Sequence, residues 1–440
     1  MSFSKFAKAI FAILLFSSLS YSQWFQQQSG VTQQLNSVVF VNQNTGFIAG
    51  DSGVVLRTTN GGINWNSNII LGTTVSYKSV YFYNLTTGYI AGRILNIDSN
   101  TIDAEPKIIK TTNGGMNWFS ILNDSGYTLR SIYFLNQNTG FALGGLYSIL
   151  TNYLLTTTNS GTNWTLSSPG NGYLDNITFK DAFTGYMVTL TGFIYKTTNS
   201  GVNWSSYMSE PVNELLSLHF VDANLGFITG GNLLGIDSAG EIYKTVNGGN
   251  NWSLVYYDHK GMINSIKFVS SNIGFAVGTL DNTPVSVPAR VIKTTNSGNG
   301  WFIDTTFNNI TGLTSVYFID PLTGYTVGSN GAILKTTTGG NLIGIIPISS
   351  EVPKNYSLSQ NYPNPFNPVT TIKFDIPKES YVKVSVYDIL GNEVQTLVNE
   401  NLKAGEYKIT WDGTKYSSGI YFYKLQSGDF SLTRKMLLVK

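Results

Sequence analysis

From about residue 24 to residue 341, apolar residues alternate with polar ones in short runs separated by Gly, Asn and Thr. In SVYFYNLTTGYIAG (79–92), for example, Val80 and Phe82 alternate with Ser79 and Tyr81, which is the period of two expected of a β-strand. Thr87-Gly88 then predicts a turn. The pattern is typical of short strands joined by tight turns, so we expect an all-β chain.

This unit recurs along the chain. Its first strand ends in Phe, and a Gly-aromatic pair follows after a turn. The strand Phe occurs seven times, at Phe40, Phe82, Phe134, Phe179, Phe220, Phe268 and Phe318. The mean spacing of about 46 residues is that of a four-stranded propeller blade. We therefore predict a seven-bladed β-propeller over residues 23–346, in which each blade is strand, turn, strand, variable loop, strand, Gly-rich turn, strand.

A second turn ends each unit with a sequence such as TTNGGINW (58–65). Its Asn side chain is suited to bind nearby backbone N–H groups, Gly supplies a positive φ, and Trp fills the space between strands. Six copies carry both residues, at Asn60 and Trp65, Asn113 and Trp118, Asn159 and Trp164, Asn199 and Trp204, Asn247 and Trp252, and Asn296 and Trp301. These residues are expected to be structural.

The seventh copy, TTTGGNLIG (336–344), has no Trp, whereas Trp24 stands alone near the N-terminus. The segment 24–40 aligns with 118–134, where Trp118 completes one unit before the next begins. We therefore predict that Trp24 and its neighbours supply the outer strand of the last blade. Pairing the two ends of the repeat would close the ring, whereas an open solenoid would leave free sheet edges.

The two ends of the chain differ from the repeat. Residues 1–22 place Lys5 and Lys8 before a short apolar run, which predicts a secretory signal peptide and a mature N-terminus at Gln23. Charge density more than doubles beyond about residue 350, after a Pro-containing stretch. We expect a linker at 347–360 and a small Ig-like β-sandwich at 361–440, with Trp411 in its core.

Composition excludes several functions. The chain is 42% apolar and 12% charged, which excludes disorder, and its net charge of +2 disfavours nucleic-acid binding. It has no Cys, so disulfides and Cys-ligated metals are excluded. Its two histidines, His219 and His259, have no partners at ligand spacing, which argues against zinc. The predicted propeller also has too few Arg residues for the arginine cluster of a sialidase.

Candidate ligand residues lie in long insertions between the second and third strands of the second, third, fifth and sixth units. Such loops emerge on one face, and loops are where function concentrates. The candidates are Arg93, Asp98, Asp103, Glu105, Tyr147, Tyr153, Asp237, Asp281 and Arg290. Two of these acids meeting across a cleft would suit a glycoside hydrolase, and clustered Asp and Asn would suit Ca²⁺. We otherwise expect no cofactor.

The Gly-rich turns resemble the Asp-box, with Asn in place of Asp. Short-loop propellers with such boxes are similar to the photosystem II assembly and stability factor family and, more distantly, to sialidases, sortilin-type receptors and some xyloglucan-cleaving hydrolases. In those families the box is a structural turn far from the catalytic centre. The resemblance covers roughly residues 24–341 and implies a fold, not an activity.

The C-terminal part closely resembles the sorting domain of the type IX (Por) secretion system. Four segments carry the likeness: YPNPFNP (362–368), VYDILG (386–391), WDG (411–413) and SGIYFYKL (418–425). The resemblance implies export to the periplasm, recognition by the outer-membrane translocon and removal of the domain by a surface sortase-like peptidase. The product would be secreted or held at the cell surface.

These observations favour a monomeric, non-catalytic protein that binds a glycan, peptide or protein on one propeller face. An extracellular glycoside hydrolase and an envelope assembly factor are the alternatives. Two carboxylates about 5 to 10 Å apart in a concave site would favour the hydrolase.

Overall fold

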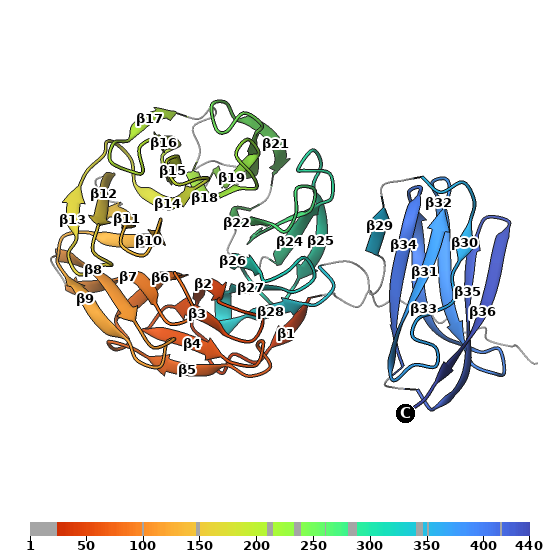
Figure 1. Ribbon diagram of the computed structural model, residues 1–440. Coiled ribbons are helices and arrows are strands. Elements are labelled where there is room, and N and C mark those ends of the chain that lie inside the picture. The colour runs from red at the N-terminus through yellow and green to blue at the C-terminus, as the bar shows by residue number, and fades with distance from the viewer. Residues whose placement is uncertain are drawn as a thin grey trace, which may run out of the picture.

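The computed structural model describes residues 24–98, 101–146, 150–208, 214–232, 239–259, 261–279, 288–339, 346–349, 352–413 and 416–440. These residues form a β-propeller and a β-sandwich (Figure 1). The predicted signal peptide and its cleavage site lie outside them. No helix within the described ranges has the length and apolar character needed to cross a membrane.

Seven four-stranded antiparallel sheets in the described residues form the blades of the propeller. Blades 1 to 4 are β2 (Leu35–Phe40), β3 (Gly46–Gly50), β4 (Val54–Thr58) and β5 (Asn66–Ile69); β6 (Val75–Phe82), β7 (Gly88–Asp98), β8 (Thr101–Thr111) and β9 (Phe119–Asn123); β10 (Thr128–Phe134), β11 (Gly140–Leu146), β12 (Thr151–Thr157) and β13 (Thr165–Ser167); and β14 (Leu174–Phe179), β15 (Gly185–Thr189), β16 (Phe193–Thr197) and β17 (Ser205–Met208). Blades 5 to 7 are β18 (Glu214–Phe220), β19 (Gly226–Asn232), β20 (Ala239–Thr245) and β21 (Ser253–Asp258); β22 (Ile263–Phe268), β23 (Gly274–Thr279), β24 (Ala289–Thr294) and β25 (Phe302–Phe307); and β26 (Leu313–Phe318), β27 (Gly324–Gly328), β28 (Ile333–Thr336) and β1 (Phe25–Gln27). In each blade the first strand of this order lies nearest the axis in Figure 1.

The ring is closed by the N-terminal strand, as predicted. β1 pairs antiparallel with β28, so that Phe25 lies opposite Lys335. Trp24 is only 1% exposed and meets Phe275 and Phe318 edge-on, with ring centroids 6.2 and 5.9 Å away. The two ends of the repeat are thus joined within one sheet, which closes the ring between the last blade and the first.

Each pair of neighbouring blades is joined by stacked aromatic rings. The aromatic residue of the Gly-aromatic pair in one blade stacks on the strand Phe of the next, as Phe47 does on Phe82 at 4.1 Å, and the Trp of that next blade meets both rings edge-on. The same stack recurs for Tyr89 and Phe134, Phe141 and Phe179, Tyr186 and Phe220, Phe227 and Phe268, Phe275 and Phe318, and Tyr325 and Phe40. Trp24 fills the Trp position of the sixth-to-seventh interface.

Two glycines of the repeat are explained by this packing. A Cβ on Gly46 would lie 2.6 Å from the Phe40 ring, and the equivalent Gly is as close to Phe in every blade. A Cβ on Gly62, whose φ is +77°, would lie 2.9 Å from the Tyr325 ring of the preceding blade. The Gly residues of the sequence pattern therefore leave room for the aromatic stack.

The predicted Asp-box turns have one hydrogen-bond pattern. In the first, Thr58 Oγ1 donates to Asn60 Oδ1 and accepts from the Gly62 N–H, while Asn60 Oδ1 also accepts from the Asn64 N–H. All six copies repeat these bonds. A basic residue that precedes the box can also reach the next blade: Lys335 Nζ donates to Gly61 O at 2.7 Å. The boxes therefore serve the fold.

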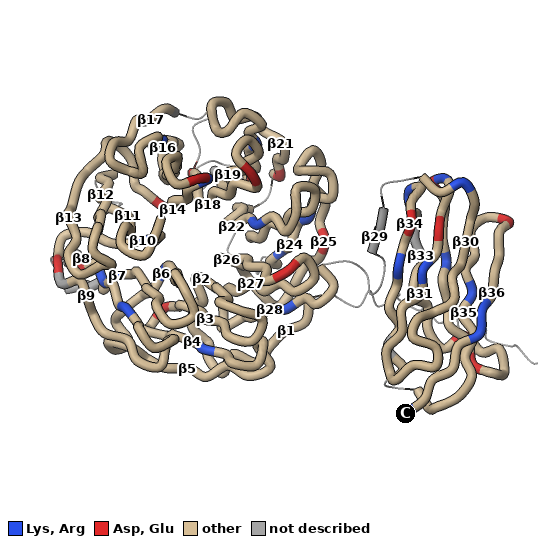
Figure 2. The backbone as a smooth tube through the Cα atoms, in the orientation of Figure 1, with Lys and Arg blue, Asp and Glu red and all other residues tan. Residues whose placement is uncertain are grey.

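The C-terminal sandwich consists of two four-stranded sheets in the described residues. One contains β29 (Ile346–Ser349), β34 (Gly405–Asp412), β31 (Val369–Ile376) and β30 (Ser357–Leu358), and the other β33 (Glu393–Leu402), β32 (Ser380–Tyr387), β35 (Gly419–Ser427) and β36 (Phe430–Leu438). β29 pairs with β34 and β30 with β31, so the segment expected as a linker carries two strands of this sheet. Trp411 is fully buried between the sheets, as predicted. Charged residues are visibly denser here than on the propeller (Figure 2).

The YPNPFNP segment is bound to the C-terminal strand. Phe366 is 2% exposed and lies 5.4 Å from the Trp411 ring, and its backbone pairs with Leu437 and Val439. Asn364 Oδ1 accepts the Leu437 N–H. The first and last motifs of this domain thus form one packed unit.

We predict that Trp24→Ala destabilises the propeller by about 3 to 5 kcal/mol, because a buried aromatic is lost at the ring closure. The loss should be at least as large as that of Trp164→Ala in the middle of the ring, where the indole is less completely buried. Calorimetry of the mature chain would measure it, with Phe25→Ala, 43% exposed, as the neighbouring control. An unchanged melting temperature for Trp24→Ala would contradict closure by β1.

Candidate binding site

The innermost strand of every blade contains a β-bulge at the same position. In β2 the register with β3 shifts between Leu35 and Ser37, so Asn36 is the extra residue. A bulge bends the strand and redirects a side chain. The seven extra residues are Asn36, Lys78, Arg130, Asp175, Leu216, Asn264 and Thr314. The fold thus gives each blade one residue on the axis whose type can vary.

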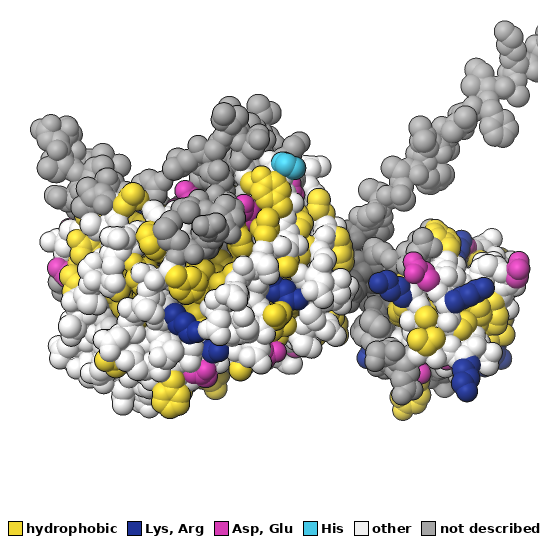
Figure 3. Space-filling model, turned by 90° about the horizontal axis from the view of Figure 1, so that it is seen from above, with side chains coloured by type: hydrophobic (Ala, Val, Ile, Leu, Met, Phe, Trp, Pro, Cys, Tyr) yellow, Lys and Arg dark blue, Asp and Glu magenta, His cyan; other side chains and the backbone are white. Residues whose placement is uncertain are grey.

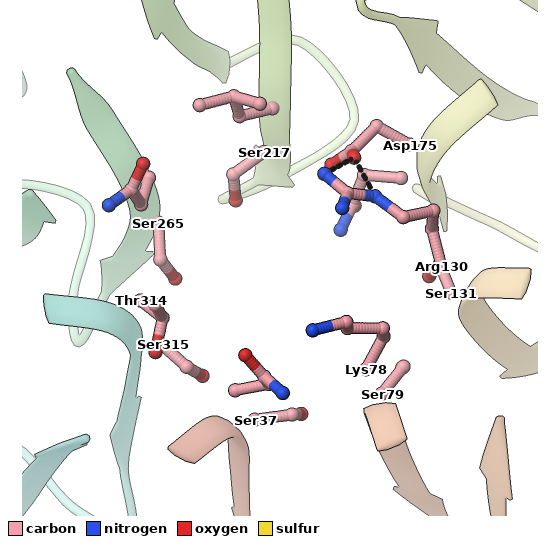
Figure 4. A pocket seen from close by; sticks show the side chains of 14 residues that line it. Ser37, Lys78, Ser79, Arg130, Ser131, Asp175, Ser217, Ser265, Thr314 and Ser315 are labelled. Atoms are coloured by element: carbon pink, nitrogen blue, oxygen red, sulfur yellow. Dashed lines mark hydrogen bonds and ion pairs between the residues drawn. The ribbon is translucent and has the colours of Figure 1, made fainter. Parts of the chain in front are cut away.

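These bulges line a cavity of about 250 Å³ on the propeller axis (Figure 4). Its wall consists of the seven bulge residues and the residue after each, namely Ser37, Ser79, Ser131, Asn176, Ser217, Ser265 and Ser315. Leu216 is the one apolar side chain in this lining. The cavity is therefore polar and rich in hydroxyl groups.

Four of these serines link neighbouring blades by hydrogen bonds. Ser37 Oγ accepts the Val80 N–H of the next blade at 3.2 Å, and Ser79, Ser265 and Ser315 make the equivalent bond. Ser131 and Ser217 are 6% and 8% exposed, and their hydroxyl groups have no hydrogen bond to any residue that the structure describes. These two hydroxyl groups are free to bind a molecule in the cavity.

Two ion pairs place positive charge at the cavity. Lys78 Nζ lies 2.8 Å from Asp51 Oδ1, and Arg130 donates to Asp175 Oδ1 from Nε at 2.7 Å and Nη2 at 2.6 Å. Burial lowers the pKa of Lys78, although Asp51 opposes this, while Asp175 raises the pKa of Arg130. Burial alone would raise the pKa of Asp51, but Lys78 and the hydrogen bonds that Asp51 accepts outweigh it and lower that pKa.

Arg93 and Glu214 are close enough to act on these groups. Arg93 and Arg130 both lower the pKa of Lys78, so the three cations share one electrostatic field. Arg93 Nε is buried without a hydrogen-bond partner among the described residues. Glu214 is 8% exposed, and its pKa is raised to about 7 by burial and then by Asp175. Because the pKa of Glu214 lies near 7, the cluster gains a negative charge as the pH rises through neutrality.

The predicted ligand residues lie in different environments. Arg93 belongs to the cluster just described. Glu105 pairs with Lys107 at 3.0 Å, and half-buried Tyr153 packs on Tyr127 with 5.0 Å between ring centroids. Arg290 is fully buried and paired with Asp258, so it is not presented on the ligand face as expected. The side chains of Asp98, Asp103, Tyr147, Asp237 and Asp281 lie outside the described part of the structure.

The axial cavity was not predicted, although the sequence contains a signal for it. Each innermost strand has an apolar residue, a variable residue, Ser or Asn, and a second apolar residue. The seven copies are LNSV (35–38), YKSV (77–80), LRSI (129–132), LDNI (174–177), LLSL (215–218), INSI (263–266) and LTSV (313–316). A repeated polar residue at a fixed strand position indicates a shared environment, here the axis.

No metal site occurs in the described ranges, which contain no group of three or more His, Asp or Glu residues suited to hold one. His219 stacks on Phe268 at the far end of the innermost strand. Burial, and next the Lys267 charge, lowers its pKa to about 3, so this histidine stays neutral. On the flank seen in Figure 3, charged side chains are scattered rather than gathered into a patch.

Two family profiles match the chain. Residues 16–121 and 99–256 match "Photosynthesis system II assembly factor YCF48", and residues 360–440 match "Secretion system C-terminal sorting domain". Together, the two segments that match the YCF48 profile cover more than half of the chain. The chain belongs to the YCF48 assembly factor family. Its YCF48-type propeller carries a sorting domain at the C-terminus, as the two resemblances predicted.

Solved structures agree on the fold. "YCF48 bound to D1 peptide" is 17% identical with a TM-score of 0.54, covering 73% of this chain and 98% of that one. YCF48 from Cyanidioschyzon merolae is 15% identical with a TM-score of 0.51, covering 71% and 98%. The WD40 β-propeller domain of Doa1 is 11% identical with a TM-score of 0.50, covering 71% and 96%. No curated protein matches the chain significantly.

The sorting domain places this YCF48-family member among proteins exported by the type IX secretion system. The domain implies an interaction with that machinery and a destination at the outer surface or beyond. The axial cavity therefore belongs to a protein that works outside the cell's inner membrane.

We predict that Glu214→Gln makes the protein more stable above pH 7. A carboxyl group whose pKa is raised from 4.5 to about 7 on folding contributes stability below pH 4.5 that is lost as the pH rises through 7. At pH 8 the variant should exceed the parent by about 1 to 3 kcal/mol, and the two should converge near pH 4.5. Denaturant unfolding at several pH values would measure this, and parallel pH profiles would contradict it.

Deleting residues 346–440 should leave a folded propeller that stays in the periplasm. The cut precedes β29, which pairs with the sandwich and not with a blade. Cell fractionation and protease resistance would locate the truncated protein and test its folding against the full chain. Secretion of the truncated form at the normal yield would contradict the role of the sorting domain.

Proposed function

We propose that the protein is a secreted, non-catalytic binding protein, and that its propeller binds a peptide segment of another protein at the axial cavity and the face around it. The observation that carries this proposal is the polar cavity on the axis, whose lining offers hydrogen-bonding groups that the protein itself does not use. Ser131 and Ser217 have hydroxyl groups without a hydrogen bond in the described structure, and Arg93 has such an Nε. Buried polar groups in proteins are almost always hydrogen-bonded, so the buried Arg93 Nε favours a ligand on the face beside the cavity, and the two hydroxyl groups face the cavity, where a ligand can reach them.

The size and character of the cavity suit part of a peptide. About 250 Å³ accommodates one polar side chain or a chain end, while the rest of the ligand would lie on the face outside. Lys78 and Arg130 keep N–H groups beyond those used by Asp51 and Asp175. Leu216 adds one apolar contact. Because the wall consists of β-strands, the site is held rigidly, which reduces the entropy lost on binding.

A related protein suggests the ligand class. One of the similar solved structures is of YCF48 bound to D1 peptide. We extend peptide binding, not that particular peptide, to this chain. A role as an assembly factor for another envelope protein is compatible with this proposal, because such a factor would bind segments of its client.

The second candidate is a glycoside hydrolase. It is favoured by Glu214, whose raised pKa near 7 suits a general acid, with Asp175 acting on it electrostatically. Two features argue against it. Asp175 is already held by Arg130, and Glu214 does not line the axial cavity. We therefore favour binding without catalysis.

Leu216→Trp tests the proposal, because it fills the axial cavity without altering a charge or a hydrogen bond. The mature chain would be screened against a displayed peptide library and a glycan array. We expect selected peptides to lose at least tenfold in affinity for Leu216→Trp, whereas the control Leu254→Trp, on the outer strand and 44% exposed, should bind as the parent does. Unchanged melting temperatures would show that both variants are folded.

Three results would overturn the proposal. Binding that is equal in Leu216→Trp and the parent would place the ligand elsewhere. Capture of glycans alone would change the ligand class. Cleavage of an array oligosaccharide that is abolished by Glu214→Gln would identify a hydrolase.

A further inference from the structure

We propose that the axial cavity binds a single carboxylate group of the ligand, held between Lys78 and Arg130 with Ser131 and Ser217 as additional donors. This inference rests on the proposed binding function and specifies the chemical group that enters the cavity. The carboxylate would come either from an acidic side chain or from a chain end.

The arrangement of donors supports a small anion. Figure 4 shows the Lys78 amine and the Ser217 hydroxyl pointing into the cavity, with Arg130 at its edge beside Asp175. The Lys78 and Arg130 side chains are 16% and 29% exposed, so their charges are only partly hydrated. Hydrogen bonds from such cations to a carboxylate are about twice as strong as neutral ones.

The charge balance supports one negative charge. Lys78, Arg93 and Arg130 supply three positive charges, and Asp51 and Asp175 neutralise two of them. The Glu214 carboxyl group, whose pKa is about 7, is mostly protonated at pH 6.5 and adds little negative charge there. One positive charge remains. A carboxylate neutralises it. Phosphate at pH 6.5 is mainly a monoanion whose hydroxyl groups would face the donors of Lys78 and Arg130, and its dianionic form would add repulsion from Asp51 and Asp175.

The lining also discriminates by hydrogen bonding. Lysine and arginine have only donors, and the Ser131 and Ser217 hydroxyl groups are free to donate as well. A carboxylate presents two acceptor oxygens and satisfies several of these donors. The isosteric amide brings an NH₂ group, which would face Lys78 or Arg130 and leave a donor unpaired at a cost.

The test uses four small probes with the mature chain at pH 6.5: N-acetyl-glutamate amide, its isostere N-acetyl-glutamine amide, N-acetyl-glycylglycine and inorganic phosphate. The first has only a side-chain carboxylate and the third only a terminal one, so they separate the two sources. Saturation-transfer NMR would give the affinity for the organic probes, and their displacement would report phosphate. We expect one or both carboxylate probes to bind at least tenfold more tightly than the amide and than phosphate.

Three variants locate the site. Lys78→Met should weaken carboxylate binding at least tenfold. The control is Lys180→Met: Lys180 is half-buried just beyond the far end of β14 and donates to Ala223 O, so its loss should leave carboxylate binding unchanged. Asp175→Asn frees the Arg130 guanidinium and removes a negative charge, so it should tighten binding several-fold. This opposite effect keeps the test decisive even if Lys78→Met is unstable.

The inference is overturned if the amide binds as well as the acid, if phosphate binds more tightly, if Asp175→Asn weakens binding, or if Lys78→Met and Lys180→Met behave alike. Selected peptides that are sensitive to Leu216→Trp but indifferent to a carboxylate would refute the anion site and leave the binding function standing. Carboxylate binding by a protein that selects no peptide would refute the peptide-binding function and leave the anion site standing.

Discussion

The propeller depends on one contact, the stacking of the aromatic residue of each blade on the strand Phe of the next. Centroid distances at these stacks run from 3.9 Å for Tyr89 and Phe134 to 5.3 Å for Phe141 and Phe179. The glycines beside the rings are there because any Cβ would strike them. Since a blade cannot bury its aromatic residue alone, each packs on both neighbours, and closure of the ring covers the last of these surfaces. This packing explains why Trp24, next to the predicted mature N-terminus, is only 1% exposed.

The same repetition creates the site. Seven equivalent strands meet at the axis, and a bulge in each places one residue there without breaking the sheet. Serine hydrogen bonds between blades help to maintain the geometry, and the bulge residue varies in type from Leu216 to Arg130. Asn36, Asn264 and Thr314 also hydrogen-bond to the next blade, whereas Lys78, Arg130 and Asp175 form ion pairs. Some bulge residues can therefore change to suit a ligand with little loss of stability.

The cations of this cavity are restrained rather than free. Asp51 and Asp175 hold Lys78 and Arg130 in position and reduce the penalty of burying them. Pre-positioned charges bind an anion with little loss of conformational entropy. The sorting domain is stabilised in a different way, because its YPNPFNP segment and C-terminal strand pack on Trp411. The two parts of the chain therefore have separate cores.

The number of blades, the structural role of the Asn and Trp boxes and the ring closure by Trp24 could all be predicted from the sequence, because each depends on a local pattern repeated at a fixed spacing. Both domains were likewise identified through their motifs. Arg290, predicted on a surface loop, lies buried against Asp258, and two short strands occupy the expected linker, because both features depend on partners distant in sequence. The axial cavity could not be predicted from any one unit: Lys78, Arg130 and Ser217 come from three blades, and only closure of the ring brings them to one axis.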